Sequence, residues 1–124
     1  MLDPTPSLYR RLGGYDAIAA FVDDLLPRLR TDPQIGVYWK GMCAHNLRKH
    51  RQLVVDFLSS AVGGPAAYQG LDMKTSHDGL AISDSDWSVF VRHTVATLDD
   101  LGVKDPEKSD FLAAAGSLKG DIVA

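Results

Sequence analysis

The sequence contains very little cysteine and no long apolar stretch. Cys43 is the only cysteine among 124 residues, which excludes an internal disulfide and indicates a reducing compartment. No apolar run approaches the roughly 18 residues of a membrane span. Residues 1–7 also lack the basic start and apolar stretch of a signal peptide. These features predict a cytoplasmic protein without a membrane segment, in which Cys43 is a packing or loop residue.

The sequence also lacks an excess of positive charge. The 13 Lys and Arg residues are outnumbered by 16 Asp and Glu residues, for a formal net charge of -3. The basic residues are spread along the chain, so the footprint of a nucleic-acid-binding protein is missing. Because 45% of the residues are apolar, we expect one domain over residues 1–124 with a true core.

Common catalytic motifs are missing as well. We find no Cys or His pair at zinc spacing, no glycine-rich phosphate loop and no nucleophile elbow, so nothing supports a hydrolase. Four histidines remain as candidates for a catalytic or metal-binding role. His50 lies in an apolar stripe and is either a core residue or a pocket residue. His77 ends a short helix and is either a solvated helix terminus or a ligand, whereas we expect His45 and His93 to be exposed.

The apolar residues of the sequence recur mostly at helical spacing, and no alternating pattern typical of a strand appears. A helix is predicted from Asp16, and Pro27 within it predicts a bend or an irregular turn near Leu26. A longer helix is predicted to end before Gly63. The apolar face of the first helix consists of Ile18, Phe21, Val22, Leu25, Leu26 and Leu29. The inward stripe of the longer helix consists of Leu47, His50, Val54, Phe57, Leu58 and Ala61.

Two short helices are predicted from capping residues. Asp32 and Pro33 begin one, which carries Ile35, Tyr38 and Trp39. Asp72 caps the other, which extends through His77 and is ended by Gly79.

Two further helices complete an all-α domain of four substantial helices and several short ones. Ser83 and Asp86 form a capping-box pattern for a helix that reaches Leu101. Asp105 and Pro106 begin the last helix. The inward residues of these two helices are Trp87, Phe90, Val91, Val95 and Leu98, and then Phe111, Leu112, Ala115 and Leu118.

Four segments together resemble the truncated haemoglobins. They are LYRRLGG at 8–14, FLSSAVGGP at 57–65, MKTSH at 73–77 and LDDLGV at 98–103, and the likeness runs from about Ser7 to the C-terminus. The resemblance implies a truncated globin-like two-over-two helical sandwich around haem b, with His77 as the proximal iron ligand. A ligating imidazole directs its other ring N–H to a backbone carbonyl or similar acceptor.

On the distal side, the resemblance places His50 next to bound ligand, with Val54 and Leu58 one and two turns further along. Leu26 occupies the place where many members of the family have a tyrosine. Trp39 occupies the place where they usually have a phenylalanine, or Tyr38 does if the register is shifted by one residue. His50 is then the one hydrogen-bonding distal side chain, as in oxygen-storage globins. The alternative is that His50 itself binds the iron as a sixth ligand.

The resemblance also implies the rest of the pocket. Lys74 and Arg51 are candidates to pair with the haem propionates. Phe90 stands where a second subgroup has a tryptophan, which favours the first subgroup. The remaining wall would come from Leu58, Met73, Ile82, Trp87, Phe90, Ala115 and Leu118, each of which is otherwise a plain core residue.

The function expected from this pocket is reversible binding of oxygen, carbon monoxide or nitric oxide. An enzymatic alternative is nitric-oxide dioxygenation or peroxidase-like turnover, which needs a separate reductase as partner. A third alternative is a helical interaction module without a cofactor, which predicts a colourless protein.

Overall fold

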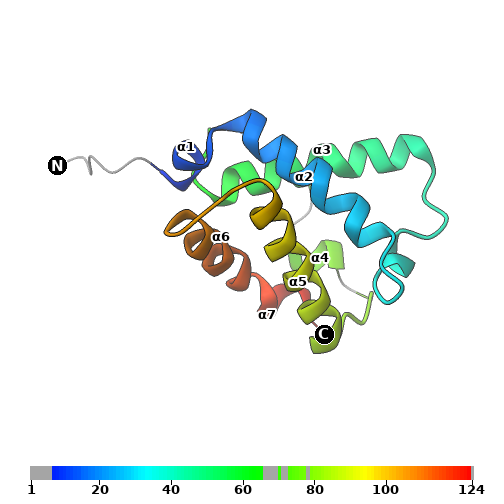
Figure 1. The fold of residues 1–124 in the computed structure, drawn as a ribbon. Helices are drawn as coiled ribbons and strands as arrows, with labels where there is room; N and C mark the ends of the chain where they lie inside the picture. Colours follow the sequence, from blue (N-terminus) through cyan, green and yellow to red (C-terminus); the bar gives the residue numbers. More distant parts are fainter. Residues whose placement is uncertain (1–6, 66–69, 71–72, 78, 124) are drawn as a thin grey trace.

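The computed structural model describes residues 7–65, 70, 73–77 and 79–123, and this part of the chain is helical, without strands (Figure 1). The four longest helices are the four that the sequence predicts, so the all-α expectation is confirmed. The elements are α1 (Leu8–Leu12), α2 (Tyr15–Arg30), the 3₁₀ helix η1 (Gly36–Trp39), α3 (Ala44–Ala61), α4 (Met73–His77), α5 (Asp84–Asp100), α6 (Glu107–Gly116) and α7 (Lys119–Ile122).

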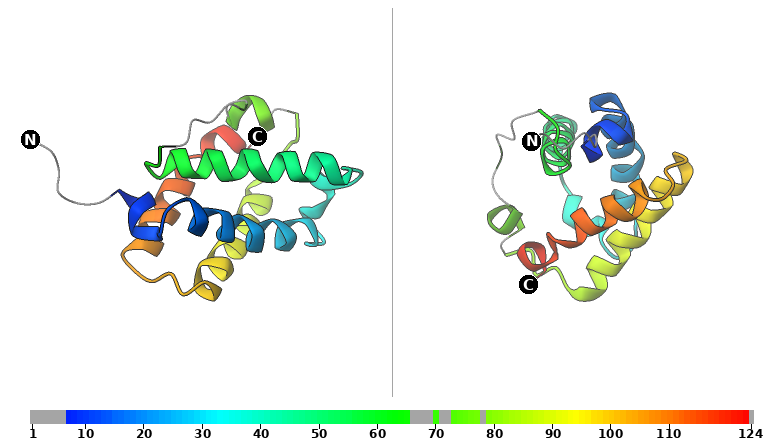
Figure 2. Two further views of the ribbon diagram at one scale, coloured as in Figure 1. Left: turned by 90° about the horizontal axis from the view of Figure 1, so that it is seen from above. Right: turned by 90° about the vertical axis from the view of Figure 1, so that its left-hand side faces the viewer.

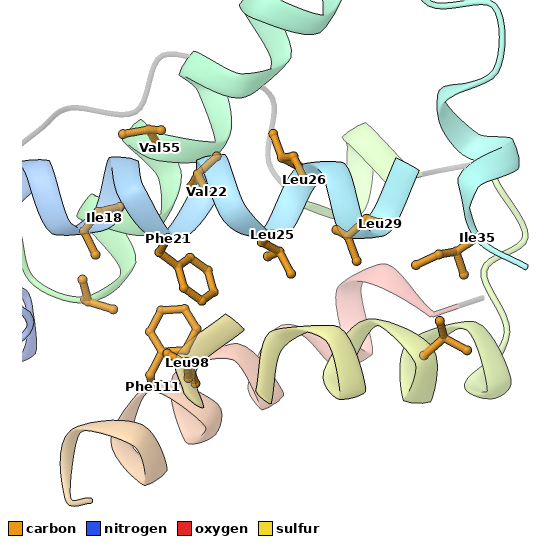
Figure 3. Close-up of a cluster of buried hydrophobic side chains, with 12 residues drawn as sticks. Ile18, Phe21, Val22, Leu25, Leu26, Leu29, Ile35, Val55, Leu98 and Phe111 are labelled. Carbon is orange, nitrogen blue, oxygen red and sulfur yellow. The ribbon is translucent and has the colours of Figure 1, made fainter. Parts of the chain in front are cut away.

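Helix α2 lies at the centre of the fold. It runs antiparallel to α3 on one side (Figure 2) and packs against α5 on another. Figure 3 shows Val22 and Leu26 pointing toward α3, whereas Phe21 and Leu25 point toward α5 and α6. The Phe21 ring meets the ring of Phe111 on α6 edge-on, with ring centroids 4.9 Å apart. One helix therefore joins both layers of the domain.

The predicted apolar face of α2 is confirmed, because all six residues are at most 5% exposed. Burying each such side chain contributes about 1.5–3 kcal/mol. An irregular turn near Leu26, one of the two expectations for Pro27, is excluded, since α2 continues as an α-helix through Pro27 to Arg30. Pro27 is exposed, and buried Leu25, Leu26 and Leu29 hold the helix on both sides of it. The core contacts outweigh the one hydrogen bond that proline removes.

Helix α3 buries a face that is offset from the predicted one. Val55 and Ser59 are buried, and so is Val62 just after the helix, whereas Ala61, predicted to face inward, is exposed. The spacing 55, 59, 62 is one helical face, and it lies against α2. The other members of the predicted stripe, which are Leu47, His50, Val54, Phe57 and Leu58, are half-buried.

The glycine pair after α3 allows α1 to pack closely on the end of that helix. The Tyr9 amide donates a hydrogen bond to the Val62 carbonyl at 2.9 Å. A Cβ at Gly64 would lie 2.6 Å from the Tyr9 ring and 2.8 Å from the Ser59 carbonyl oxygen. Only glycine fits this contact without displacing the backbone or the ring.

A buried polar pair ties the segment after α2 to α5 and corrects one expectation. His93, predicted to be exposed, has a side chain only 19% exposed, with Nε2 2.7 Å from Asp32 Oδ2. The Asp32 carboxylate also accepts hydrogen bonds from the amides of Gln34 and Ile35 at 2.7 and 3.1 Å. Helical periodicity could not reveal this pair, because its members are 61 residues apart.

The remaining helix boundaries follow the capping pattern. Ser83 and Asp86 form the predicted capping box of α5, and α4 ends at His77, while its expected cap Asp72 lies outside the described residues. The last predicted helix is divided into α6 and α7, with Phe111 its one buried residue. On α5, Trp87 and Leu98 are buried as expected, whereas Phe90, Val91 and Val95 are half-buried. Within the described residues no helix is long and apolar enough to cross a membrane.

Candidate functional site

His77 at the end of α4 has one ring nitrogen held by its own helix. Its Nδ1 lies 2.8 Å from the Met73 carbonyl oxygen and 3.0 Å from Ser76 Oγ. Because a carbonyl can only accept, Nδ1 carries the proton, and Nε2 presents a lone pair. A half-buried imidazole oriented in this way is suited to bind a metal ion through Nε2.

Next to His77 lies a pocket with a volume of about 100 Å³. Its other walls come from α5, from the segment around η1 and from α7, which packs against α4. The Trp87 and Phe90 rings in its wall are 5.2 Å apart between centroids. The lining residues are Ile35, Tyr38, His77, Ile82, Asp86, Trp87, Phe90 and Ile122. Ile82, Trp87 and Phe90, predicted as pocket wall, are therefore beside His77, whereas Ala115 and Leu118 are not among the lining residues.

Among the described residues, the pocket wall contains one carboxylate, Asp86, which the sequence interpretation treated only as a helix cap. Asp86 accepts hydrogen bonds from Gln34 Nε2 and Tyr38 Oη, each at 2.7 Å, and from the Ser83 amide at 3.1 Å. These donors lower the pKa of Asp86 to about 2, with Gln34 contributing most. The same contact raises the pKa of the Tyr38 phenol. Asp86 is therefore an anion at neutral pH. The capping pattern gave no signal for this role, because the donors Gln34 and Tyr38 come from a distant segment.

His50 on α3 is the second histidine of this region. It is half-buried, and its ring meets the Trp39 ring edge-on at a centroid distance of 6.1 Å. Burial lowers the pKa of His50, and the positive charges of His77, when it is protonated, and of Arg30 lower it further. His50 is therefore neutral at pH 7 and has one N–H to donate.

The other predicted site residues are divided between the interior and the surface. Leu26 is 4% exposed and belongs to the core between α2 and α3. Val54, Leu58 and Phe90 are half-buried and pack against that core, as does Trp39. Of these residues, only Phe90 is among the described residues that line the pocket beside His77.

Lys74 and Arg51, the two basic residues expected to pair with the haem propionates, lie in different surroundings. Lys74 is exposed on α4. Arg51 makes two hydrogen bonds to Asp23 on α2, at 2.8 and 3.0 Å. The pairing of Lys74 or Arg51 with a haem propionate stays a prediction.

A larger cavity of about 220 Å³ lies away from both histidines. Every described residue in its lining has an apolar side chain, so none of these side chains offers a donor, acceptor or charge for chemistry. The lining consists of Leu12, Ala17, Ile18, Ala20, Phe21, Leu98, Leu101, Val103 and Phe111. The chemistry of this chain is concentrated around His77.

Known proteins share both the sequence pattern and the fold. Residues 7–124 match the family described as bacterial-like globin. The chain is 32% identical over 119 residues to a group 1 truncated hemoglobin of Chlamydomonas moewusii, covering 94% of this chain and 68% of that protein. It is 30% identical over 100 residues to a group 1 truncated hemoglobin of Tetrahymena thermophila, covering 81% of this chain and 80% of that one.

Solved structures show the same helical arrangement. The truncated hemoglobin of Tetrahymena pyriformis in its Fe(III) form superposes with a TM-score of 0.88 at 24% identity, covering 96% of this chain and 99% of that one. The 2/2 hemoglobin of a Synechococcus species, with covalently attached heme, gives a TM-score of 0.85 at 22% identity, covering 95% and 98%. The two-over-two sandwich expected from the sequence is confirmed.

Proposed function

Because this chain belongs to the bacterial-like globins, and among them to the group 1 truncated haemoglobins, we propose that it binds oxygen or another diatomic ligand reversibly at a haem iron ligated by His77. Family membership makes haem the cofactor and confirms the predicted first subgroup. The observation that carries the proposal is the His77 ring, whose Nδ1 is held by the Met73 carbonyl at the edge of an apolar pocket.

The residues around His77 fit a haem. An iron held by four porphyrin nitrogens needs one protein imidazole with a free Nε2, and the Met73 hydrogen bond provides that tautomer. A flat apolar macrocycle needs apolar walls, which Trp87, Phe90 and Ile82 supply. The pocket beside His77 is smaller than the roughly 300 Å³ at the lower end of cofactor sites. We therefore assign it to the proximal side of the haem only.

The distal side would be formed by α2 and α3. Haem supplies a ferrous iron that binds a diatomic ligand, and the protein decides how polar the surroundings of that ligand are. His50 is neutral and donates one N–H, while Leu26 and Val54 provide apolar surface. This combination favours a ligand that accepts a hydrogen bond, as oxygen does. The apolar side chains would exclude water from the remaining surroundings of the ligand.

Spectra of the purified protein test the proposal directly. The ultraviolet-visible spectrum is recorded oxidised, reduced, and reduced under carbon monoxide. We expect an intense Soret band that shifts with carbon monoxide. The reduced spectrum before gas is added shows whether His50 binds the iron as a sixth ligand or leaves it five-coordinate.

Substitution of the ligand tests the role of His77. His77→Ala should lose haem on gel filtration, because the one protein bond to the iron is removed. His45→Ala is the matched control, since His45 is exposed on α3 and should not affect haem content. A His77→Ala protein that keeps full haem content and a histidine-bound spectrum would refute the assignment. A wild-type protein without a Soret band, even after addition of haemin, would refute the function as a whole.

A further inference from the structure

The pocket beside His77 contains a charge that neither haem binding nor the distal hydrogen bond uses. Among the described residues that line that pocket, Asp86 is the one acidic residue, and the others besides His77 are aliphatic or aromatic. Its carboxylate lies in the first turn of α5, and the buried Trp87 follows it directly. A carboxylate on an apolar wall close to a metal ligand is costly unless something holds it.

Neutral donors, and no cation, hold this carboxylate. The amide of Gln34 reaches Oδ1, while the Tyr38 hydroxyl and the Ser83 amide reach Oδ2. In the described part of the chain, no Lys or Arg forms an ion pair with Asp86, in contrast to Asp23, Asp24 and Asp84. Hydrogen bonds to neutral groups keep a carboxylate ionised without cancelling its charge. One full negative charge therefore remains in the pocket wall.

We propose that the Asp86 carboxylate sets the reduction potential of the haem iron by stabilising the ferric state. The inference rests on the proposed ligation by His77, because the shared pocket then places Asp86 on the proximal side of the iron. Ferric haem carries one more positive charge than ferrous haem. A fixed negative charge in the wall of the same pocket therefore favours the ferric form.

A purely structural role for Asp86 makes a different prediction. Asp86 completes the capping box of α5 and anchors Tyr38 and Gln34, so its loss could disturb the pocket without any effect of charge. Removing the Tyr38 hydroxyl breaks the same anchor but leaves the charge in place. A structural role shifts the potential in the same direction in both variants. An electrostatic role shifts it toward ferrous in Asp86→Asn, and leaves it unchanged or shifts it toward ferric in the variant without the Tyr38 hydroxyl.

The test is a potentiometric titration of the holoprotein at pH 7 with redox mediators, following the Soret band. Asp86→Asn is nearly isosteric and removes the negative charge. At a fixed applied potential it should lower the ratio of ferric to ferrous protein by roughly threefold to tenfold. A tenfold shift corresponds to about 59 mV for one electron. Tyr38→Phe should leave the ratio unchanged or shift it toward ferric, because the carboxylate loses a donor that partly offsets its charge.

Asp84→Asn is the matched control on the same helix. Its side chain is 81% exposed and paired with Lys119, so its removal should leave the potential within error of the wild type. Equal potentials for Asp86→Asn and wild type would overturn the proposal, as would shifts of Asp86→Asn and Tyr38→Phe in the same direction. If Asp86→Asn does not yield folded holoprotein, a shift of Tyr38→Phe toward the ferrous form is by itself enough to overturn the proposal. These results are separate from a failure of His77 ligation, which the wild-type spectra and His77→Ala reveal first.

Discussion

Replacing His50 by leucine removes the one polar side chain assigned to the distal side. Leucine retains an apolar body of moderate size, so the half-buried position on α3 stays filled, although the edge contact with Trp39 is lost. His50 is neutral at pH 7 because burial lowers its pKa, and it offers a single N–H. The substitution therefore removes one neutral hydrogen bond to the ligand and no charge.

The size of the effect follows from that hydrogen bond. One N–H donated to a partially negative acceptor contributes about 1–2 kcal/mol, between the ranges for neutral and charged partners. At about 1.4 kcal/mol per factor of ten, oxygen should dissociate roughly 5- to 30-fold faster from His50→Leu than from wild type. Carbon monoxide is less polar when bound, so its dissociation rate should change much less.

Stopped-flow measurement of oxygen release, with carbon monoxide as the trap, gives the rate. The ratio of the oxygen effect to the carbon monoxide effect separates hydrogen bonding from changed packing against Trp39, because packing acts on both ligands. His45→Leu is the control on the same helix and should release oxygen at the wild-type rate, since His45 is exposed.

Two outcomes would count against this role of His50. Oxygen dissociation from His50→Leu at the wild-type rate would show that His50 does not donate to the ligand. Faster oxygen association in His50→Leu, together with a six-coordinate reduced spectrum in wild type, would instead show that His50 occupies the iron and competes with oxygen.

Two further predictions concern stability. Gly64→Ala should lower the free energy of unfolding by roughly 1–3 kcal/mol, because its Cβ would collide with the Tyr9 ring and the Ser59 carbonyl. Gly116→Ala, which meets nothing within 4 Å, should be neutral or stabilising in the same urea titration, and equal losses in both variants would contradict this explanation. Because the pKa of Asp86 is lowered from 3.8 to about 2 in the folded chain, its carboxylate stabilises the fold above about pH 4 and loses this effect as the pH falls toward 2. The stability difference between wild type and Asp86→Asn should therefore be constant near neutrality and vanish toward pH 2, and a difference that persists at pH 2 would show that the effect does not come from the charge.

Local patterns predicted the helices well and their faces less well. The apolar face of α2, the capping box of α5 and the short helix ending at His77 are all present. Each depends on residues within a few positions of one another, so helical spacing and capping chemistry are sufficient to identify them. The offset face of α3 was missed because half-buried residues such as Val54 have the same apolar character as buried ones such as Val55.

The errors share a physical cause. Pro27 does not interrupt α2, because buried leucines on both sides hold the helix. His93 is not a surface residue, since Asp32 reaches it from a segment 61 residues away. In both cases packing or polar contacts with distant parts of the chain outweigh the local pattern.

By itself, the sequence determined the all-helical class and the order of the helices, because turns, caps and apolar spacing act over short distances. The expectation that His77 is the iron ligand came instead from the resemblance of four segments to the truncated haemoglobins. Only the tertiary structure decided which polar groups meet. It shows that Gln34 and Tyr38 hold an ionised Asp86 in the wall of the pocket beside His77. Hydrogen bonds and charges act between groups that folding brings within about 3 Å, and helical periodicity carries no information on those distances.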